Sequence, residues 1–519
     1  MNPVELSLFS HRLSAICEEM GTVLKRSAIS PNIKDREDYS CALFDVDGEL
    51  VAQAAHIPVH LGSMAYCMRD IVSGFDWREG DVVVFNDPFL GGTHLPDITV
   101  VMPVFDGDTL LGFSASRAHH ADVGGKSPGS MGVHRRLSDE GVVISPQYWI
   151  RAGEDREESL QRFMHRARNP DERLGDLAAQ RAACAVGAWR LVTLHRGMAA
   201  GAASLADACA ELLVASESYG RVCVAGIPDG AYTFEDAIED DGLAHGPLTI
   251  KMTIRIEGEM ATVDFSGTAP QCEGPLNCPL AVTAASVFYV FRCLMPAGAP
   301  QTSAIFRPVH LSAPEGSLVN ATAGAAVAAG NVETSQRIVD VVLGALAKAL
   351  PTRIPAASQG TMNNVLFGSR DWVYYETLGG GMGAHADGDG LCAVQCHMTN
   401  TRNSSIEVLE MHDPLRVLRY AVRTDSGGRG RHNGGDGLVR FWEVLDDCTV
   451  SLLSERRVSR PYGLAGGESG QAGRNRLFRD GSWRDLPAKC SMPLRPGDIL
   501  SVETPGGGGY GSPAAEEEA

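Results

Sequence analysis

The N-terminal 27 residues carry apolar side chains at the spacing of one helix face. These apolar positions are Val4, Leu8, Leu13, Ile16, Met20, Val23 and Leu24. A period near 3.6 residues gathers such positions on one side of an α-helix. We therefore predict an amphipathic helix over residues 3–27.

Beyond this helix the pattern changes to a period of two. The segment SCALFDVDGELVAQ alternates and predicts a β-hairpin that turns at Asp47-Gly48. A helix is expected over residues 60–72, and DVVVF predicts a buried strand. The apolar runs ITVVMPVF and LLGFSAS, separated by a short polar turn, predict a second hairpin.

The remaining chain divides by composition. Residues 150–222 are rich in Ala, Leu, Arg and Glu and predict helices, whereas a period of two returns from residue 227 in LTIKMTIRIEGEMATVDFSG. A helix is expected over residues 331–350, closed by Pro351. After about residue 355 the chain becomes Gly-rich and strand-like to its end.

These patterns predict a mixed α and β protein built of several interlocked lobes. We expect an N-terminal strand-rich metal lobe (1–150), a helical segment (151–225), a second α/β section (226–354) and a Gly-rich, β-rich C-terminal section (355–519). No Pro/Ser-rich linker separates them, so separable domains are not expected.

Composition narrows the classes of partner. The 519 residues carry a net charge of −19, which repels phosphate backbones and argues against nucleic acid. No signal peptide or membrane span is visible in the sequence. The thirteen cysteines are scattered and form no CxxC pair, which favours buried reduced thiols and a cytoplasmic location.

Metal-binding side chains flank the predicted second hairpin. His94 and Asp97 precede its first strand, and His119, His120 and Asp122 follow its second. Imidazole and carboxylate groups at neighbouring strand ends are the ligands of mixed N/O metal sites, and this set suits zinc or manganese without excluding iron. From the residues alone, a divalent metal site and a hydrogen-bonded polar cluster both remain open. Asp38 is equally open: it could supply a further oxygen, or it could be a turn or cap residue.

Three other patterns have more than one interpretation. His56 and His60 precede a predicted helix and could either donate hydrogen bonds to a substrate carbonyl or cap that helix. The segment SGGRGRHNGGDG is either an anion cradle or a flexible surface hairpin. The sequence GKS at residues 125–127 resembles the end of a phosphate-binding loop, but His120 occupies the position of the required first glycine.

Long motifs along the chain resemble the B-type subunits of the hydantoinase/oxoprolinase family. They are RxDYSCALFDxDGxLVAQAxHIPVHLGSM, NDPFxGGTHLPDxTVVxPVF, RAHHADVGGxxPGSM, GDLAAQRAA, IPDGAYTFED, GNVETSQRI, TNTRNSSIEVLE and TPGGGGYG. The resemblance covers nearly the whole length of the chain.

The resemblance implies a site and a partner. It implies a divalent metal held by His94, Asp97 and His119, with Asp38 as a further ligand. His120 or Asp122, just outside these ligands, is expected to orient a ligand or accept a proton from water. The resemblance also implies a separate A-type subunit that binds ATP and Mg²⁺ and forms an A2B2 hetero-oligomer with this chain. ATP binding by that partner agrees with the missing phosphate-binding loop in this sequence.

The implied reaction is ATP-dependent hydrolysis of a cyclic amide such as a hydantoin, 5-oxoproline or another lactam. In relatives ATP phosphorylates the carbonyl oxygen, and the activated species is hydrolysed in the B-type subunit. Three alternatives remain: a subunit of an ATP-dependent carboxylase of small ketones such as acetone, a non-catalytic scaffold subunit, and a stand-alone metal-dependent cyclic amidase.

Overall fold

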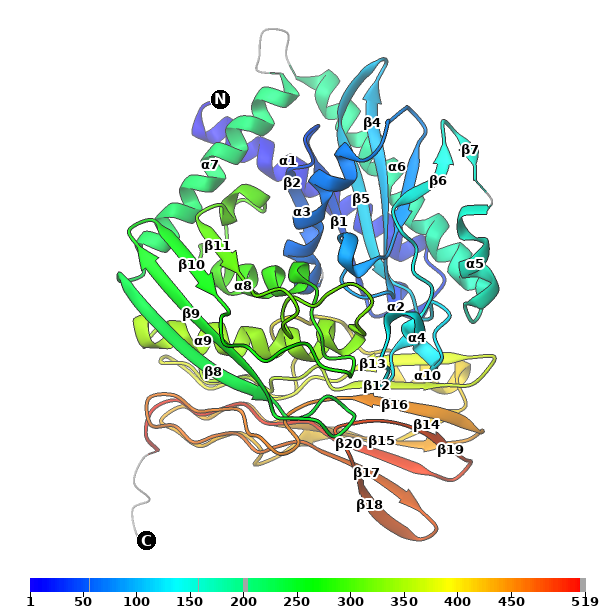
Figure 1. Cartoon of the computed structure of the whole chain (residues 1–519), viewed down its shortest axis with the longest axis vertical. Helices are drawn as coiled ribbons and strands as arrows, with labels where there is room; N and C mark the ends of the chain where they lie inside the picture. Colours follow the sequence, from blue (N-terminus) through cyan, green and yellow to red (C-terminus); the bar gives the residue numbers. More distant parts are fainter. Residues whose placement is uncertain (56, 157, 199–203, 514–519) are drawn as a thin grey trace.

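Four β-sheets and the helices packed on them make up the part of the chain that the computed structural model describes (Figure 1). That part comprises residues 1–55, 57–156, 158–198 and 204–513. The protein has the mixed α and β architecture that the sequence predicts. No described helix combines the length and the apolar character needed to cross a bilayer.

The N-terminal sheet has seven strands in the order β2-β1-β5-β4-β3-β6-β7. They are β1 Tyr39–Phe44, β2 Leu50–Ala55, β3 Val82–Phe85, β4 Asp97–Asp106, β5 Thr109–His119, β6 Gln147–Arg151 and β7 Glu154–Asp155. Both predicted hairpins are confirmed, because β1 pairs with β2 and β4 pairs with β5, each antiparallel. The register of the second hairpin places Asp97 opposite His119.

Helices cover both faces of this sheet. The N-terminal part contains α1 Pro3–Ser27, α2 Pro31–Lys34, α3 Pro58–Ser73, η1 Pro88–Leu90, η2 Pro128–Ser130, α4 Leu137–Glu140, α5 Glu158–Arg166, α6 Pro170–Gly197 and α7 Leu205–Ala225. The predicted N-terminal helix is confirmed as α1, which starts with a capping box at Asn2 and packs with α6 on one face. Helix α3 contributes Met64 and Met68 to a separate apolar cluster with β3 and β5 on the opposite face.

A second sheet has the order β11-β10-β9-β8. This section contains β8 Gly230–Ile238, β9 Leu248–Glu257, β10 Met260–Asp264, α8 Leu280–Cys293, η3 Ser303–Phe306, β11 Val309–Ser312, η4 Gly330–Thr334 and α9 Ser335–Ala349. The helix expected over residues 331–350 opens with a π-helical turn, and its regular part begins at Ser335. Helix α8 was not predicted: it is buried along most of its length, so its sequence lacks an amphipathic period.

Two further sheets form the C-terminal part, with the orders β13-β12-β16-β19 and β14-β15-β20-β17-β18. Their elements are β12 Asn364–Gly368, β13 Val373–Thr377, α10 Ile406–His412, β14 Leu415–Arg423, β15 Gly437–Val444, β16 Cys448–Leu453, β17 Arg474–Arg479, β18 Ser482–Leu486, β19 Lys489–Leu494 and β20 Ile499–Glu503. The sheets share one apolar core around the fully buried Trp442 and form the lower layers of Figure 1.

The glycine-rich tracts are not strands but a packed bundle of extended segments. Residues 506–509 lie at its centre, and successive residues hydrogen-bond in different directions. The N–H of Gly507 donates to the carbonyl of Gly435, the N–H of Gly508 to that of Ala357, and the N–H of Gly509 to that of Glu468. The segment SGGRGRHNGGDG belongs to this bundle, in which the N–H of Gly428 donates to the carbonyl of Gly507. Its interpretation as an anion cradle stays a prediction.

Candidate metal centre

His94, Asp97 and His119 converge at one end of the β4–β5 hairpin. Asp97 begins β4, His119 ends β5, and the two are paired across the hairpin. Each of the three residues offers one ligand atom within 4.8 Å of the other two, and all three are buried. Among the described residues this is the one such group of His, Cys, Asp or Glu.

The facing atoms are close but do not satisfy one another. Asp97 Oδ1 lies 3.2 Å from His94 Nε2 and 3.4 Å from His119 Nδ1. Neither His94 Nε2 nor Asp97 Oδ1 has a hydrogen-bond partner in acceptable geometry. Buried polar atoms are nearly always paired, so these two orphaned atoms, which face one another, fit a cation held between them. Two imidazoles and a carboxylate are ligands that zinc or manganese accepts.

The second oxygen of Asp97 is held by other side chains. The Thr93 hydroxyl donates to Oδ2, and His60 Nε2 lies 3.3 Å from the same atom. His60 is in the first turn of α3, and its Nδ1 lies 3.1 Å from the Ser40 hydroxyl. His60 therefore contacts the carboxylate of Asp97, and it lines the same cavity. It does not cap α3, because that helix has no side-chain cap hydrogen bond. Its expected role in binding substrate stays a prediction.

Electrostatics keep the cluster in a form suited to metal binding. Burial by itself would raise the pKa of Asp97, but the nearby imidazoles of His94, His60 and His119 hold it well below its usual value. Burial lowers the pKa of His119, which favours the neutral imidazole. Metals bind the carboxylate and the neutral imidazole, so both shifts favour ligation.

Asp38 lies at the margin of the cluster. Its Oδ2 is 3.9 Å from His119 Nδ1 and 3.9 Å from a guanidinium nitrogen of Arg36. The carboxylate lines the same cavity as the three convergent residues. Its position is compatible with the further oxygen ligand that the sequence suggested.

Tyr375 completes the site from a distant part of the chain. Its ring, on β13, stacks on His119 with centroids 4.9 Å apart and planes 20° apart. The Arg36 guanidinium lies 4.4 Å from the centroid of the same ring, and the tyrosine hydroxyl donates to Asn364 Oδ1 over 2.9 Å. Nothing in the sequence pattern around Tyr375 marks it as a neighbour of His119.

The cluster borders a small cavity of about 20 Å³, lined also by Asn331, Met362 and Thr401. A space of roughly 10–15 Å³ is what one water needs, so this cavity accommodates a single ion or water.

His120 and Asp122 do not join the cluster. Successive residues of a strand point to opposite faces, so His120 points toward α6, where its Nε2 lies 2.9 Å from Gln180 Oε1. Burial lowers the pKa of His120 to about 4. Asp122 accepts hydrogen bonds from the backbone of Gly124 and Gly129 and from Arg168. The catalytic roles expected for these two residues find no support in these positions, and His56 lies outside the described residues.

Comparison with known proteins identifies the family. A profile of the hydantoinase B/oxoprolinase family matches residues 2–513, and the chain belongs to this family. It is 41% identical to 5-oxoprolinase 1 of Arabidopsis thaliana over 98% of the chain. It is 31% identical to the B-type subunit of a putative D-/L-hydantoinase of a Pseudomonas species over 100% of the chain. It covers 42% of the first relative and 91% of the second.

A solved structure supports the fold. The ATP-dependent caprolactamase of Pseudomonas jessenii superposes with a TM-score of 0.92 at 27% identity, over 99% of this chain and 91% of that one. The chain thus spans about two fifths of the plant 5-oxoprolinase but nearly all of the matched caprolactamase chain.

Proposed function

We propose that this chain is the metal-containing subunit of an ATP-dependent hydrolase of cyclic amides. The observation that carries the proposal is the set of unsatisfied ligand atoms of His94 and Asp97, with His119 beside them, facing a cavity for one ion. Membership of the hydantoinase B/oxoprolinase family supplies the class of reaction.

Each residue around the cavity has a proposed task. His94, Asp97 and His119 hold a divalent cation, and Asp38 is the further ligand. Such an ion, when bound, supplies Lewis-acid chemistry, polarising a carbonyl oxygen or lowering the pKa of a water toward about 7. His60 and Thr93 fix the carboxylate of Asp97, and Tyr375 fixes the plane of His119. Residues outside the ligand set that hold ligands in place raise both affinity and geometric precision.

The substrate class follows from the relatives. Amide resonance makes a lactam a poor electrophile, and phosphorylation of its carbonyl oxygen by ATP turns that oxygen into a leaving group. Hydantoin, 5-oxoproline and caprolactam, for which these relatives are named, all contain an amide carbonyl within a ring. We propose that this chain receives such an activated cyclic amide and adds water to its carbonyl carbon. The ring C–N bond then breaks as the nitrogen takes up a proton, and a second water releases phosphate from the acyl phosphate that remains.

A partner supplies the ATP chemistry. More than half of the plant 5-oxoprolinase lies outside its match to this chain, whereas the matched hydantoinase chain is of similar length. We propose that an A-type ATP-binding subunit here provides what the longer relative carries in one polypeptide. We propose two copies of each subunit, in the cytoplasm.

The test combines the chain with a purified A-type subunit, ATP and a panel of hydantoin, 5-oxoproline and caprolactam. The expected result is ring opening that needs both proteins, ATP and bound metal. His94→Ala should lose metal and activity together, whereas His11→Ala, at an exposed position on α1, should keep both.

Other outcomes identify the alternatives. Incorporation of labelled bicarbonate into a ketone, without ring opening of any cyclic amide, would assign the chain to a carboxylase. Ring opening by this chain alone would make it a stand-alone amidase. Full activity of His94→Ala with metal content unchanged would overturn the metal centre itself.

A further inference from the structure

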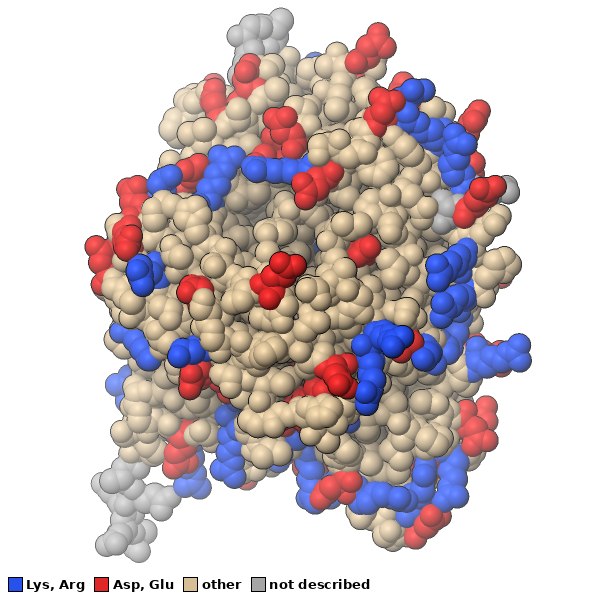
Figure 2. Space-filling view, in the orientation of Figure 1, with Lys and Arg blue, Asp and Glu red and all other residues tan. Residues whose placement is uncertain are grey.

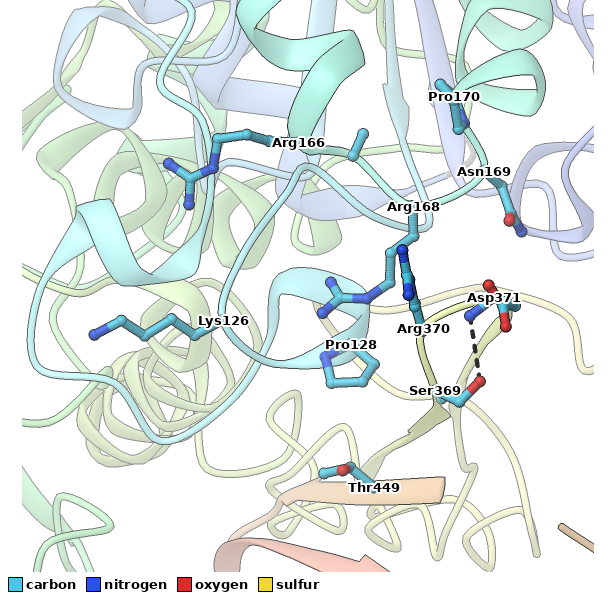
Figure 3. Close-up of a pocket in the computed structure, with 12 residues that line it drawn as sticks. Lys126, Pro128, Arg166, Arg168, Asn169, Pro170, Ser369, Arg370, Asp371 and Thr449 are labelled. Carbon is cyan, nitrogen blue, oxygen red and sulfur yellow. Dashed lines mark hydrogen bonds between the residues drawn. The ribbon is translucent and has the colours of Figure 1, made fainter. Parts of the chain in front are cut away.

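A wide cleft lies apart from the metal cavity. Its volume is about 860 Å³, and it shares no lining residue with the cavity beside His119. Three segments form its walls: the turn between β12 and β13, the loop around Pro128, and residues 166–170, which join α5 to α6 (Figure 3).

Basic side chains line this cleft in a protein of net charge −19. They are Lys126, Arg166, Arg168 and Arg370, and Asp371 is the one acidic residue of the lining. Figure 3 shows them arriving from different segments, with Arg166 on the side of α5 and Arg370 at the β12–β13 turn. In Figure 2 basic side chains gather along the right edge of the face, where Figure 1 places α4 and α5.

Two of the four cations have no ion-pair partner among the described residues. Lys126 is paired with Asp139 at 2.8 Å, and Arg168 with Asp122 at 2.8 Å. Arg166 and Arg370 are exposed and form no ion pair with any residue that the structure describes. Asp371 offsets one positive charge, and the lining of the cleft still carries an excess of positive charge.

The wall that carries Arg168 is held rigidly. Asp122 accepts from the backbone N–H of Arg168 at 3.0 Å and from its guanidinium at 2.8 Å. The same carboxylate accepts from Gly124 and Gly129 in the facing loop. A wall fixed in advance lowers the entropic cost of binding. Asp122 therefore positions this cleft.

We propose that the cleft binds a small molecule through its phosphoryl group, with Arg166 and Arg370 as the principal contacts. A guanidinium presents paired N–H donors that match phosphate oxygens, and charge-assisted bonds of this kind are strong. Ser369, Asn169 and Thr449 offer polar groups for the rest of the molecule. A volume within the range of roughly 300–1,000 Å³ typical of metabolite pockets favours a small molecule over a protein segment.

The cleft and the metal cavity both lie next to β13. Asp371 is in the turn before β13, and Tyr375, which stacks on His119, is four residues further along. Where the proposed function holds, the phosphoryl group belongs to the activated amide, to released phosphate or to a nucleotide.

The test is calorimetric titration of the isolated chain with inorganic phosphate, pyrophosphate and ADP. Wild type should bind at least one of them, and the double variant Arg166→Ala/Arg370→Ala should bind it at least about tenfold more weakly, which is the loss expected for one charge-assisted contact. Arg162→Ala is the matched control, because Arg162 lies one turn earlier on α5 and does not line the cleft. Its affinity should equal that of wild type.

A further variant distinguishes binding of the phosphate probes in the cleft from binding at the metal centre. His94→Ala should bind the phosphate probes as wild type does, and the double arginine variant should keep its metal content. The ranking of the three probes identifies which source of the phosphoryl group the cleft prefers. Failure of the proposed hydrolase activity leaves this measurement unaffected.

Two results would overturn the proposal. The first is no binding of any probe, or equal affinity in wild type and the double variant. The second is a double variant that binds the probes normally but no longer associates with the A-type subunit, which would assign the cleft to an acidic protein segment.

Discussion

The metal cavity and the glycine bundle are built on opposite principles. Around the cavity, the proposed metal site depends on which side-chain atoms are present, and the backbone brings Asp97 and His119 face to face. In the bundle around Gly507 the side chains are absent, and backbone N–H and carbonyl groups of distant segments bond directly. The metal cavity thus depends on the chemistry of its side chains, whereas the bundle depends on the absence of side chains. Different substitutions should therefore disrupt the two regions.

The largest effect is expected from Gly507→Ala. A Cβ at this position would collide with the carbonyl group of Met382, which is fixed by the bundle. Overpacking of this kind costs on the order of 3 kcal/mol or more. We expect little folded protein, or a strongly lowered midpoint in urea denaturation. Gly197→Ala is the control, because a Cβ there meets nothing within 4 Å, and its stability should match or exceed that of wild type. Equal stability of the two variants would contradict the steric account.

Asp97→Asn should have the converse effect, with the fold kept and the metal lost. The substitution preserves shape but removes the charge that faces His94 and His119. We expect metal affinity to fall by more than about 100-fold, beyond the range for residues outside the ligand set. Elemental analysis and competition with a chelating dye measure this, and circular dichroism checks the fold. A variant that retains its metal would remove Asp97 from the ligands.

His60→Gln should produce a smaller loss at the same centre. His60 contacts Asp97 but offers no atom to the three-residue group. Residues that orient a ligand typically change metal affinity by about 10–100-fold. The expected result is weaker metal binding in which added metal restores activity. A loss as severe as that of Asp97→Asn would place His60 among the ligands.

A change in the pH dependence of stability is expected from Glu333→Gln. Burial raises the pKa of Glu333 to about 8 from an ordinary value of 4.5, with partial opposition from hydrogen bonds. The folded protein then binds more protons than the unfolded chain between these pH values, so stability falls as pH rises from 4.5 through about 8. Glutamine cannot ionise, and urea denaturation across this range should give a flatter profile. An unchanged slope would assign the pH dependence to other groups.

Local elements were predictable because their signal lies in neighbouring residues. The helix α1 and the β4–β5 hairpin follow from periods of 3.6 and two, and the ligand-bearing segments at the hairpin ends were visible for the same reason. The catalytic role predicted for His120 did not take into account the alternating directions of neighbouring side chains, which is also a local property. Adjacent strand residues point in opposite directions, so His119 and His120 could not both face one cavity.

The sequence by itself determined the family, the mixed α and β class and the short segments that carry His94, Asp97 and His119. Only the tertiary structure decided that His60 contacts Asp97, that Tyr375 covers His119, and that the glycines form a bundle instead of strands. The physical reason is the distance along the sequence between the residues that make contact. A helix or hairpin is fixed by residues a few positions apart, whereas Tyr375 meets a histidine more than 250 residues earlier, and no local period records such a contact.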